Sequence, residues 1–310
     1  MRTSQYWKRV KQVLPCIEED VWDRNPSSPN VLRVGDKLRM YYGARQEQSV
    51  RVGFAEADVA DPFTWKKMCD RSLLDPGEPG AIDSHWIGAC PWVVPITNTH
   101  WHMYYITWGG EYGPTGIKIW RTSMAESDDS GITWERTGRS LLELDRPGAC
   151  DEHGTGSSSV RKVGDEYWMW YTGVSSPRAD WNRISVALAV SSDGGHIFTP
   201  HSAGALVNIP PTIGMPGSTC SRPFVERTEE GFRMWFSCAK DGVHYRIHYA
   251  ESPDGIHFKW WPEPVLDVSA SGWDHTMVCY PSILHLEDRT LMYYAGDGYV
   301  GIGVAELATR

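Results

Sequence analysis

The chain has 310 residues, a formal net charge of −9 and 41% hydrophobic residues. The negative charge, with no run of basic residues, argues against electrostatic binding of nucleic acid or of an anionic membrane. No apolar stretch reaches the roughly 18 residues of a membrane-spanning helix, and Lys8, Arg9 and Lys11 interrupt the region where a signal peptide would be apolar. We therefore expect a cytoplasmic protein with a small, largely uncharged partner.

Strand-like segments recur in the same order along the whole chain. A motif of proline, any residue and an apolar residue recurs about every 60 residues, which is the spacing of a propeller blade or another repeat unit. Its anchor positions are Pro29, Pro91, Ser158 (without the proline), Pro223 and Pro281. A long repeat of strand-rich units predicts a β-propeller, here of five blades in a single catalytic domain spanning residues 1–310.

Each anchor begins an inner strand that is followed by further strands with alternating apolar and polar residues. The predicted second strands are 37–43, 101–106, 166–172, 231–238 and 290–295. The predicted third strands are 50–55, 117–121, 184–189, 245–250 and 301–306.

Outer strands are predicted from Phe63, from Ile132 and from Ile256, but the fifth unit stops after its third strand. The segment Gln5 to Leu14 has the missing outer-strand pattern. We therefore predict an all-β fold: a five-bladed β-propeller with four antiparallel strands per blade, its last blade closed by the N-terminal strand.

Three turns carry a shared pattern of Ser, Asp and Gly before an aromatic residue. They begin at Ser127, Ser191 and Ser252. They resemble the Asp-box turns of sialidases, in which Asp and Ser bind turn amides and Gly takes a left-handed backbone angle. We interpret Asp129, Asp193 and Asp254 as structural residues.

Four aspartates stand six to eight residues before the anchors of units one, two, three and five. They are Asp23, Asp83, Asp151 and Asp274, and Glu152 is adjacent to the third. Because the inner strands begin at one end of the central channel, we expect at least three of these carboxylates to face one cavity there. Grouped carboxylates separate each other's pKa values and so supply the acid and the base that glycoside hydrolysis needs. The alternative for each aspartate is a turn residue that caps the entry to a strand.

Aromatic and cationic side chains beside these carboxylates complete the predicted funnel, where they could stack on a sugar or bind an anionic group. They are Trp22, His85, Trp86, His153, Arg222, Trp273 and His275. His85, His153 and His275 could also coordinate a divalent ion in the central channel, and three imidazoles would favour a transition metal over calcium. Paired-carboxylate catalysis itself requires no cofactor.

As an architecture, the repeat and its acidic funnel resemble the five-bladed propeller glycosidases of families 43, 32, 68 and 130. The resemblance implies a base or nucleophile at Asp23 and a residue that tunes the acid's pKa at Asp151. The acid of these families is usually a Glu of the fourth blade, where this chain has Gly217 to Arg222 without a carboxylate. Glu152 is the first substitute, and the others are Asp83, Glu47, Glu111, Asp180, Asp241 and Asp297.

The sequence therefore predicts a cytoplasmic, exo-acting glycoside hydrolase for short oligosaccharides, with inversion of configuration implied by the resemblance. A His-ligated metal-dependent enzyme, a glycoside phosphorylase and a non-catalytic sugar-binding propeller are the alternatives.

Overall fold

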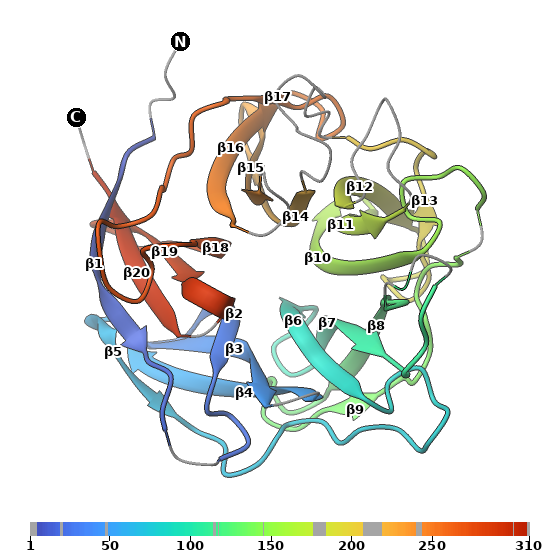
Figure 1. The fold of residues 1–310 in the computed structure, drawn as a ribbon, viewed down its shortest axis with the longest axis horizontal. Coiled ribbons are helices and arrows are strands. Elements are labelled where there is room, and N and C mark those ends of the chain that lie inside the picture. Colours follow the sequence, from blue (N-terminus) through green and yellow to red (C-terminus); the bar gives the residue numbers. More distant parts are fainter. Residues whose placement is uncertain are drawn as a thin grey trace.

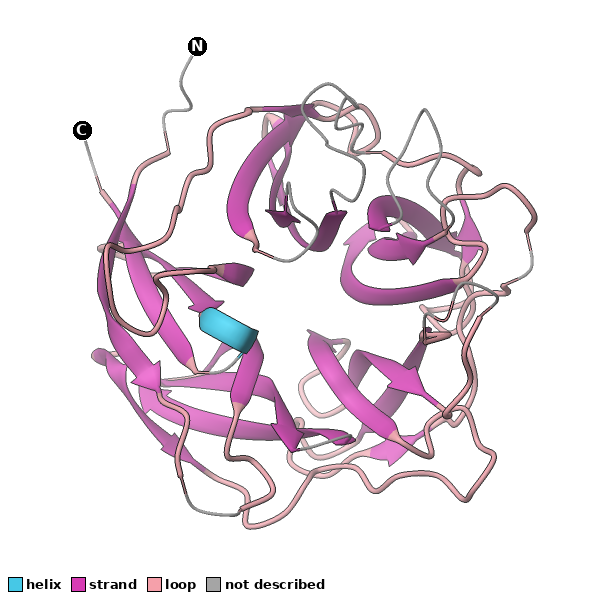
Figure 2. Cartoon of the chain, in the orientation of Figure 1, coloured by secondary structure: helices cyan, strands magenta, loops and turns pink. Residues whose placement is uncertain are grey.

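The computed structural model describes residues 5–18, 21–46, 49–113, 116, 118–144, 146–175, 184–206, 219–239, 244–299 and 301–308. Regular structure in these segments is β-strand, apart from one short 3₁₀ helix, η1 (Asp297–Tyr299), which Figure 2 shows near the centre. No helix in these segments has the length and apolar character needed to cross a membrane.

In the described segments, twenty strands form one sheet of four and two sheets of eight, arranged around a common centre (Figure 1). Each eight-stranded sheet consists of two antiparallel sets of four strands joined by one parallel bridge, Val50 to Trp86 or Ile184 to Thr219, and we call each set of four strands a blade. The first and second blades contain β2 (Pro26–Val34), β3 (Lys37–Gln46), β4 (Ser49–Asp58), β5 (Asp61–Lys67), β6 (Trp86–Pro95), β7 (Trp101–Trp108), β8 (Arg121–Ser127) and β9 (Glu135–Arg136). The third and fourth contain β10 (Gly154–Val163), β11 (Glu166–Val174), β12 (Ile184–Ser191), β13 (Thr199–Pro200), β14 (Thr219–Thr228), β15 (Gly231–Ala239), β16 (Arg246–Ser252) and β17 (Lys259–Trp260). The fifth contains β18 (Cys279–His285), β19 (Thr290–Ala295), β20 (Ile302–Leu307) and β1 (Trp7–Leu14).

The N-terminal strand completes the last blade, as the sequence predicts. Strand β1 pairs antiparallel with β20, with Trp7 opposite Leu307 and Leu14 opposite Ile302. Figure 1 shows β1 alongside β20 at this blade. This pairing covers two strand edges that would otherwise remain open to other chains.

Every inner strand contains the same bulge at its anchor. The residue before the anchor has a positive φ in all five blades: Ser28 (55°), Cys90 (53°), Ser157 (44°), Arg222 (51°) and Tyr280 (60°). The pairing with the second strand shifts register at the same place. A left-handed conformation costs a non-glycine residue about 1–3 kcal/mol and is often found at functional sites. The anchor motif therefore marks a bend that directs five side chains differently from an ordinary strand.

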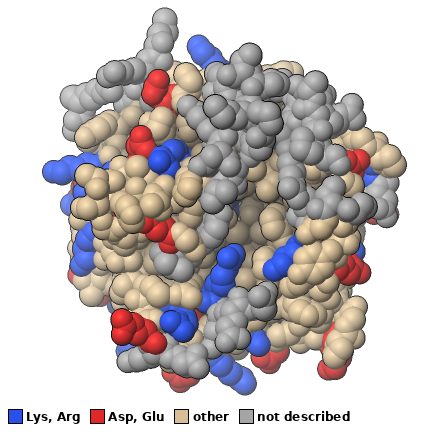
Figure 3. Space-filling model, in the orientation of Figure 1, with Lys and Arg blue, Asp and Glu red and all other residues tan. Residues whose placement is uncertain are grey.

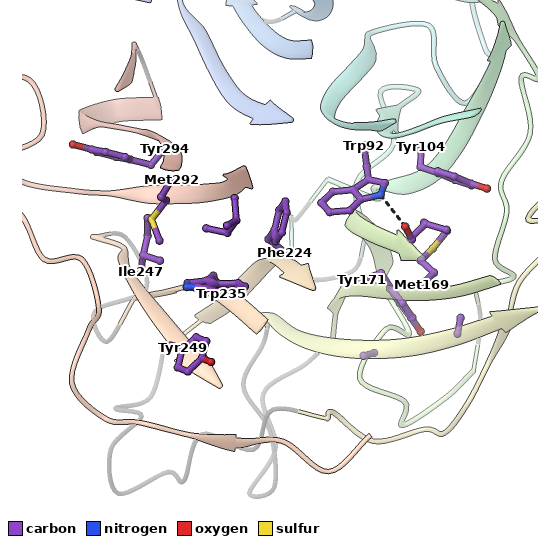
Figure 4. Close-up of a cluster of buried hydrophobic side chains, with 14 of the residues drawn as sticks. Trp92, Tyr104, Met169, Tyr171, Phe224, Trp235, Ile247, Tyr249, Met292 and Tyr294 are labelled. Atoms are coloured by element: carbon purple, nitrogen blue, oxygen red, sulfur yellow. Dashed lines mark hydrogen bonds between the residues drawn. The ribbon is translucent and has the colours of Figure 1, made fainter. Parts of the chain in front are cut away.

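Aromatic side chains fill the interfaces between blades. The ring of Trp92 on β6 meets the ring of Phe224 on β14 edge to face, with 5.1 Å between centroids, and Figure 4 shows the two side chains facing each other. The Trp92 Nε1 donates to the carbonyl of Val160 on β10 at 3.0 Å. Three blades thus meet in one cluster, which makes the inner strands a rigid support.

The Asp-box turns have the structural role that the sequence predicts. Asp129 Oδ1 accepts hydrogen bonds from the amides of Ile132 (3.0 Å) and Thr133 (2.9 Å) and from the Ser127 hydroxyl (2.8 Å). Burial raises the pKa of Asp129, but the hydrogen bonds from Thr133 and its neighbours outweigh burial and bring that pKa to about 2. Asp129 therefore stays charged and holds the turn.

The predicted third strand of the second blade is wrong. The strand there is β8, which begins at Arg121, whereas the prediction ended at that residue. Apolar and polar residues alternate before β8 because of local packing. The Lys118 ammonium lies 4.0 Å from the centroid of the Trp86 ring, and the Trp120 ring stacks on Trp86 with 6.4 Å between centroids. These contacts produce a strand-like pattern without a strand.

Candidate functional site

A pocket of about 290 Å³ lies where the inner strands begin, at the end of the channel that the sequence predicts for the site. We call it the axial pocket. Four of the left-handed residues line it, together with two stacked tryptophans: Ser28, Cys90, Ser157, Tyr280, Trp86 and Trp120. The bulges thus point their side chains at one small cavity with aromatic walls and a hydroxyl-bearing surface.

The charged groups at the axial pocket are cationic. Arg45 lines it, and Lys118 packs against both Trp86 (4.0 Å to the ring centroid) and Trp108 (4.2 Å). Burial, followed by repulsion from Arg45, lowers the pKa of Lys118. Figure 3 shows Lys and Arg side chains bordering the central hollow of this face. No carboxylate of the described residues lines the axial pocket, although the whole chain is acidic.

The four aspartates of the predicted funnel lie elsewhere, because each is bound within its own blade. Asp23 accepts a hydrogen bond from the Tyr42 hydroxyl on β3 (2.8 Å) and pairs with the Lys67 ammonium on β5 (3.0 Å). Asp274 accepts from the Tyr294 hydroxyl on β19 (2.9 Å) and from Arg9 Nε on β1 (2.7 Å).

The other two aspartates are also paired with arginines. Asp151 is bound by the Tyr171 hydroxyl and by Arg146, both at 2.5 Å, and Asp83 pairs with Arg136 on β9 at 3.0 Å. All four aspartates are between 0% and 5% exposed, and none lines the axial pocket. The expectation that at least three of them face one cavity is therefore wrong: their equivalent positions fix their depth in the blade, but Asp23, Asp83 and Asp274 pair with cations on outer strands and Asp151 pairs with Arg146 in the segment before its blade.

The fourth blade supports this structural interpretation. Its funnel segment contains no aspartate, its second strand has Phe236 where three other blades have the bonded tyrosine, and its outer strand has Trp260 where others have the cation. Burial, and then the adjacent carboxylate, raises the pKa of Tyr42, Tyr171 and Tyr294, so these hydroxyls stay protonated and donate. The first and fifth blades therefore contain the aspartate, the tyrosine and the cation, whereas the fourth blade contains none of the three.

Two of the three predicted sugar-stacking tryptophans pack on their own blades. The ring of Trp22 covers Gly53, where an added Cβ would lie 2.6 Å from it, and the ring of Trp273 covers Gly303 at 2.3 Å. Trp273 also stacks on Tyr294, with 5.3 Å between ring centroids. Trp86 alone of the three lines the axial pocket.

Arg222 is a structural residue as well. Its guanidinium is 1% exposed, and Nη2 donates to the carbonyls of Ser28 (3.2 Å), Pro29 (3.1 Å) and Pro91 (3.3 Å). The side chain thus connects the fourth blade to the first and second near the axis, beside the wall of the pocket. The predicted contact with an anionic substrate is replaced by contacts with backbone oxygens.

The three funnel histidines do not come together. His85 contacts the Ser84 hydroxyl (3.1 Å), His153 lies 3.4 Å from Glu152, and His275 pairs with Asp297 (2.6 Å). Each interaction is local to one blade. Among the described residues, the His, Cys, Asp and Glu side chains that could share a metal ion are His100, His102 and Glu126, whose ligand atoms lie within 4.8 Å of one another.

The substitute acids other than Asp83 divide into three groups. Glu111 and Glu152 line a groove of about 930 Å³ between the second and third blades, which we call the interblade groove. In this groove Glu152 accepts the Gly148 amide (2.7 Å), and Glu111 pairs with Arg121 (2.5 Å). Asp297 accepts the amides of Thr276 and Met277 at 2.9 and 2.8 Å and is therefore a loop-holding residue. Glu47, Asp180 and Asp241 lie outside the described residues.

Comparisons with known proteins agree with this architecture. The family model described as "Glycosyl hydrolases family 32 N-terminal domain" matches residues 91–299. An uncharacterised protein of Mycobacterium tuberculosis (strain H37Rv), Rv1502, is 27% identical over 314 residues, which cover 97% of this chain and 99% of that protein.

Solved structures show the same fold. A protein described as "Glycoside hydrolase" superposes with a TM-score of 0.77 at 14% identity, covering 98% of this chain and 93% of the other. A structure from the GH130 family, described as mannoside phosphorylases that include glycoside hydrolases targeting β-1,2 mannosidic linkages in Candida mannan, gives 0.71 at 17% identity, covering 97% and 93%. At these identities the likeness concerns the fold alone.

Proposed function

Because this chain belongs to the family of the glycosyl hydrolase family 32 N-terminal domain, we propose that it is a cytoplasmic glycosidase-type enzyme that binds the terminal sugar of a short glycoside in the axial pocket. The observation that carries the proposal is the pocket wall: Trp86 and Trp120, stacked at 6.4 Å, stand beside the hydroxyls of Ser28 and Ser157. Aromatic faces cover the apolar face of a sugar while hydroxyls orient it.

The size of the pocket favours an exo-acting enzyme. Its volume of about 290 Å³ is at the lower limit of the roughly 300–1,000 Å³ of ordinary ligand pockets. One or two sugar units fit such a space, and the rest of the substrate would extend toward solvent. The interblade groove offers a second surface for that remainder.

The acid and base of this proposal come from carboxylates other than the four bonded aspartates. Glu152 and Glu111 in the interblade groove are the described candidates, and Glu152 remains the first choice for the acid. Glu47, Asp180 and Asp241 are candidates from the sequence, since they stand between second and third strands of their blades. An inverting enzyme needs two such groups about 6.5–9.5 Å apart.

The test measures turnover of aryl furanosides and pyranosides by the wild type and by variants with single carboxylates replaced by amides. We expect two of the five variants, those of the acid and of the base, to lose at least about 100-fold in kcat without a change in unfolding temperature. Trp86→Ala should raise KM about tenfold, or about 1.4 kcal/mol, while Trp86→Phe, which keeps the aromatic face, should stay near the wild type. Binding of sugars without turnover of any substrate would instead identify a non-catalytic sugar-binding propeller.

Phosphorolysis is the second candidate, favoured by the cations at the axial pocket. Arg45 and Lys118 flank Trp86, and no described carboxylate lines the pocket. A phosphate ion that attacks the sugar needs cations to hold it and one acid for the leaving group, but no carboxylate base. Turnover that requires inorganic phosphate and yields a sugar 1-phosphate would establish phosphorolysis, whereas phosphate-independent release of reducing sugar would establish hydrolysis.

A further inference from the structure

A cluster of histidines lies at the junction of the second and third blades, at the opposite end of the strands from the axial pocket. His100 and His102 stand at the start of β7, and Glu126 stands on β8 directly opposite His102. His196 belongs to the Asp-box turn of the third blade. We propose that this histidine cluster (His100, His102, Glu126 and His196) binds a divalent transition-metal ion, with Zn²⁺ the best match, and thereby joins the two blades.

The distances between the candidate ligand atoms suit such an ion. His100 Nε2 lies 3.1 Å from His102 Nε2, and Glu126 Oε1 lies 3.6 Å from His102 Nε2 and 4.0 Å from His100 Nε2. His196 Nε2 lies 3.0 Å from the same Glu126 oxygen. Ligands about 2.0–2.2 Å from a tetrahedral zinc ion are about 3.3 Å from one another, so the spacings among His100, His102 and Glu126 suit a metal bound by all three, with His196 beside the shared carboxylate as the fourth ligand of the proposed site.

The hydrogen bonds of the other ring nitrogens direct the Nε2 lone pairs into the cluster. His100 Nδ1 faces the Asp128 carboxylate (2.7 Å), which can only accept, so that nitrogen donates. His196 Nδ1 likewise donates to the Asp193 carbonyl (3.0 Å).

The third histidine is fixed in the same way. His102 Nδ1 lies 3.2 Å from the Tyr104 hydroxyl, whose single proton is donated to the Gly195 carbonyl at 3.0 Å. The hydroxyl oxygen therefore accepts from His102 Nδ1. As neutral imidazoles, all three histidines turn an unprotonated Nε2 toward the cluster, as metal-bound histidines with oriented second nitrogens do.

This arrangement of lone pairs suits a cation. The Nε2 atoms of His100 and His102 and the Glu126 Oε1 atom lie 3.1–4.0 Å from one another, and His196 Nε2 lies 3.0 Å from the same Glu126 oxygen. When all three imidazoles are neutral and carry their proton on Nδ1, no hydrogen lies between these atoms. A metal ion bound by these atoms would replace the contacts between lone pairs with metal–ligand bonds. Imidazole ligands with a single carboxylate favour zinc and its neighbours over calcium or magnesium.

In the first blade, an arginine side chain supplies the positive charge at the equivalent position. There Arg39 occupies the strand position of His102 and Glu56 that of Glu126. The Arg39 guanidinium bonds Glu56 at 2.8 Å and the Ser130 carbonyl, in the Asp-box turn of the next blade, at 2.6 Å. In the second blade a bound metal would supply the same positive charge between the glutamate and the next turn.

An ion can reach the cluster from solvent. The side chains of His100, Glu126 and His196 are each about one-third exposed, whereas His102 is buried at the back. The site is also separate from the proposed sugar site, because none of its four residues lines the axial pocket. Metal binding can therefore be tested without a known substrate.

The experiment titrates chelator-treated protein with ZnCl₂ by calorimetry and records its unfolding temperature. We expect one ion per chain and a higher unfolding temperature, and with Co²⁺ the visible absorption of a four-coordinate site. His100→Gln and Glu126→Gln should each weaken Zn²⁺ binding at least tenfold, and Asp128→Asn, which removes only the orienting carboxylate, about tenfold. His257→Gln is the matched control, because His257 occupies the equivalent exposed turn of the fourth blade, beside Asp254.

Three results would overturn the proposal. Absence of stoichiometric Zn²⁺ binding at micromolar concentration would overturn it and would mean that protons hold the cluster together. Equal affinity of His100→Gln, Glu126→Gln and the His257→Gln control would also overturn it, as would loss of binding only in a His85→Gln variant, since the ion would then lie in the funnel.

Discussion

Replacing Asp23 by asparagine distinguishes a catalytic aspartate from one that holds a blade together. In the structure the carboxylate is 5% exposed and bound by the Tyr42 hydroxyl and the Lys67 ammonium. The substitution keeps the shape and an acceptor for the tyrosine but removes the charge that faces Lys67. We therefore expect Asp23→Asn to lower stability and to leave the axial pocket intact.

The size of the loss follows from the contacts. A hydrogen bond to a charged group contributes about 1.5–3 kcal/mol, and breaking a fully buried ion pair costs about 3–5 kcal/mol. Because the Lys67 side chain is about one-quarter exposed, we expect about 2–3 kcal/mol. For 310 residues the unfolding entropy is roughly 0.65 kcal/mol per kelvin, so the unfolding temperature should fall by about 3–5 °C.

Thermal unfolding and turnover are measured on the same preparations, with Asp58→Asn as the control. Asp58 is an exposed residue of the same blade that pairs with Lys37, so its replacement should change stability by less than about 0.5 kcal/mol. A fall in kcat of several orders of magnitude with an unchanged unfolding temperature would refute the structural interpretation and make Asp23 a catalytic residue.

Two further predictions concern the scaffold. Arg222→Met should lower the free energy of unfolding by about 2–4 kcal/mol in a denaturant titration, because three buried carbonyls lose their shared donor. Arg227→Met, at an exposed position of the same strand, is the control and should lower it by less than about 0.5 kcal/mol. Equal effects of the two substitutions would contradict the axial role of Arg222. Asp129 has a pKa of about 2 in the folded protein and an ordinary value of 3.8, so its stabilisation is present above about pH 4 and is lost as the pH falls through 2. Asp129→Asn should therefore flatten the fall of stability between pH 4 and pH 2, and an unchanged slope would show that this carboxylate is not a source of acid sensitivity.

The fold could be predicted because its signals are local and repeated. The anchor prolines mark the bulges, and the paired aromatic residues that end with Tyr42, Tyr105 or Tyr294 mark second strands. The error at β8 arose where the sequence between second and third strands forms a wall of the axial pocket. A better signal was present, because Ala125-Glu126 repeats the Ala55-Glu56 pair of the first blade's third strand.

The prediction for the aspartates was wrong because their spacing before each anchor determines how deep they lie in the blade but not the direction of their side chains. Their equivalent spacing before the anchors is real, yet the partners that turn Asp23 and Asp274 away from the axis stand on outer strands far along the chain. A sequence comparison of blades could have found them, since Lys67 and Arg9 each follow a tryptophan by two residues and the fourth blade lacks the aspartate and the cation together.

The histidine cluster and the cationic pocket wall were missed for a different reason. His196 lies 94 positions after His102, and only the contact between adjacent blades brings them together. The alternation of His100 and His102 on one strand was the available local signal. Lys118 was assigned to a strand, so its contact with Trp86 could not be anticipated.

The pairing of β1 with β20 also means that the first strand to be synthesised must wait for the last one. Residues 7–14 leave the ribosome almost 300 residues before their partner strand, and at about 5–20 residues per second they wait roughly 15–60 s. During that time an unpaired strand is a template for other chains, and Lys8, Arg9 and Lys11 give it a charged edge that disfavours such pairing. Arg9 is thus part of an open charged edge during synthesis and can bind Asp274 only when the ring is complete.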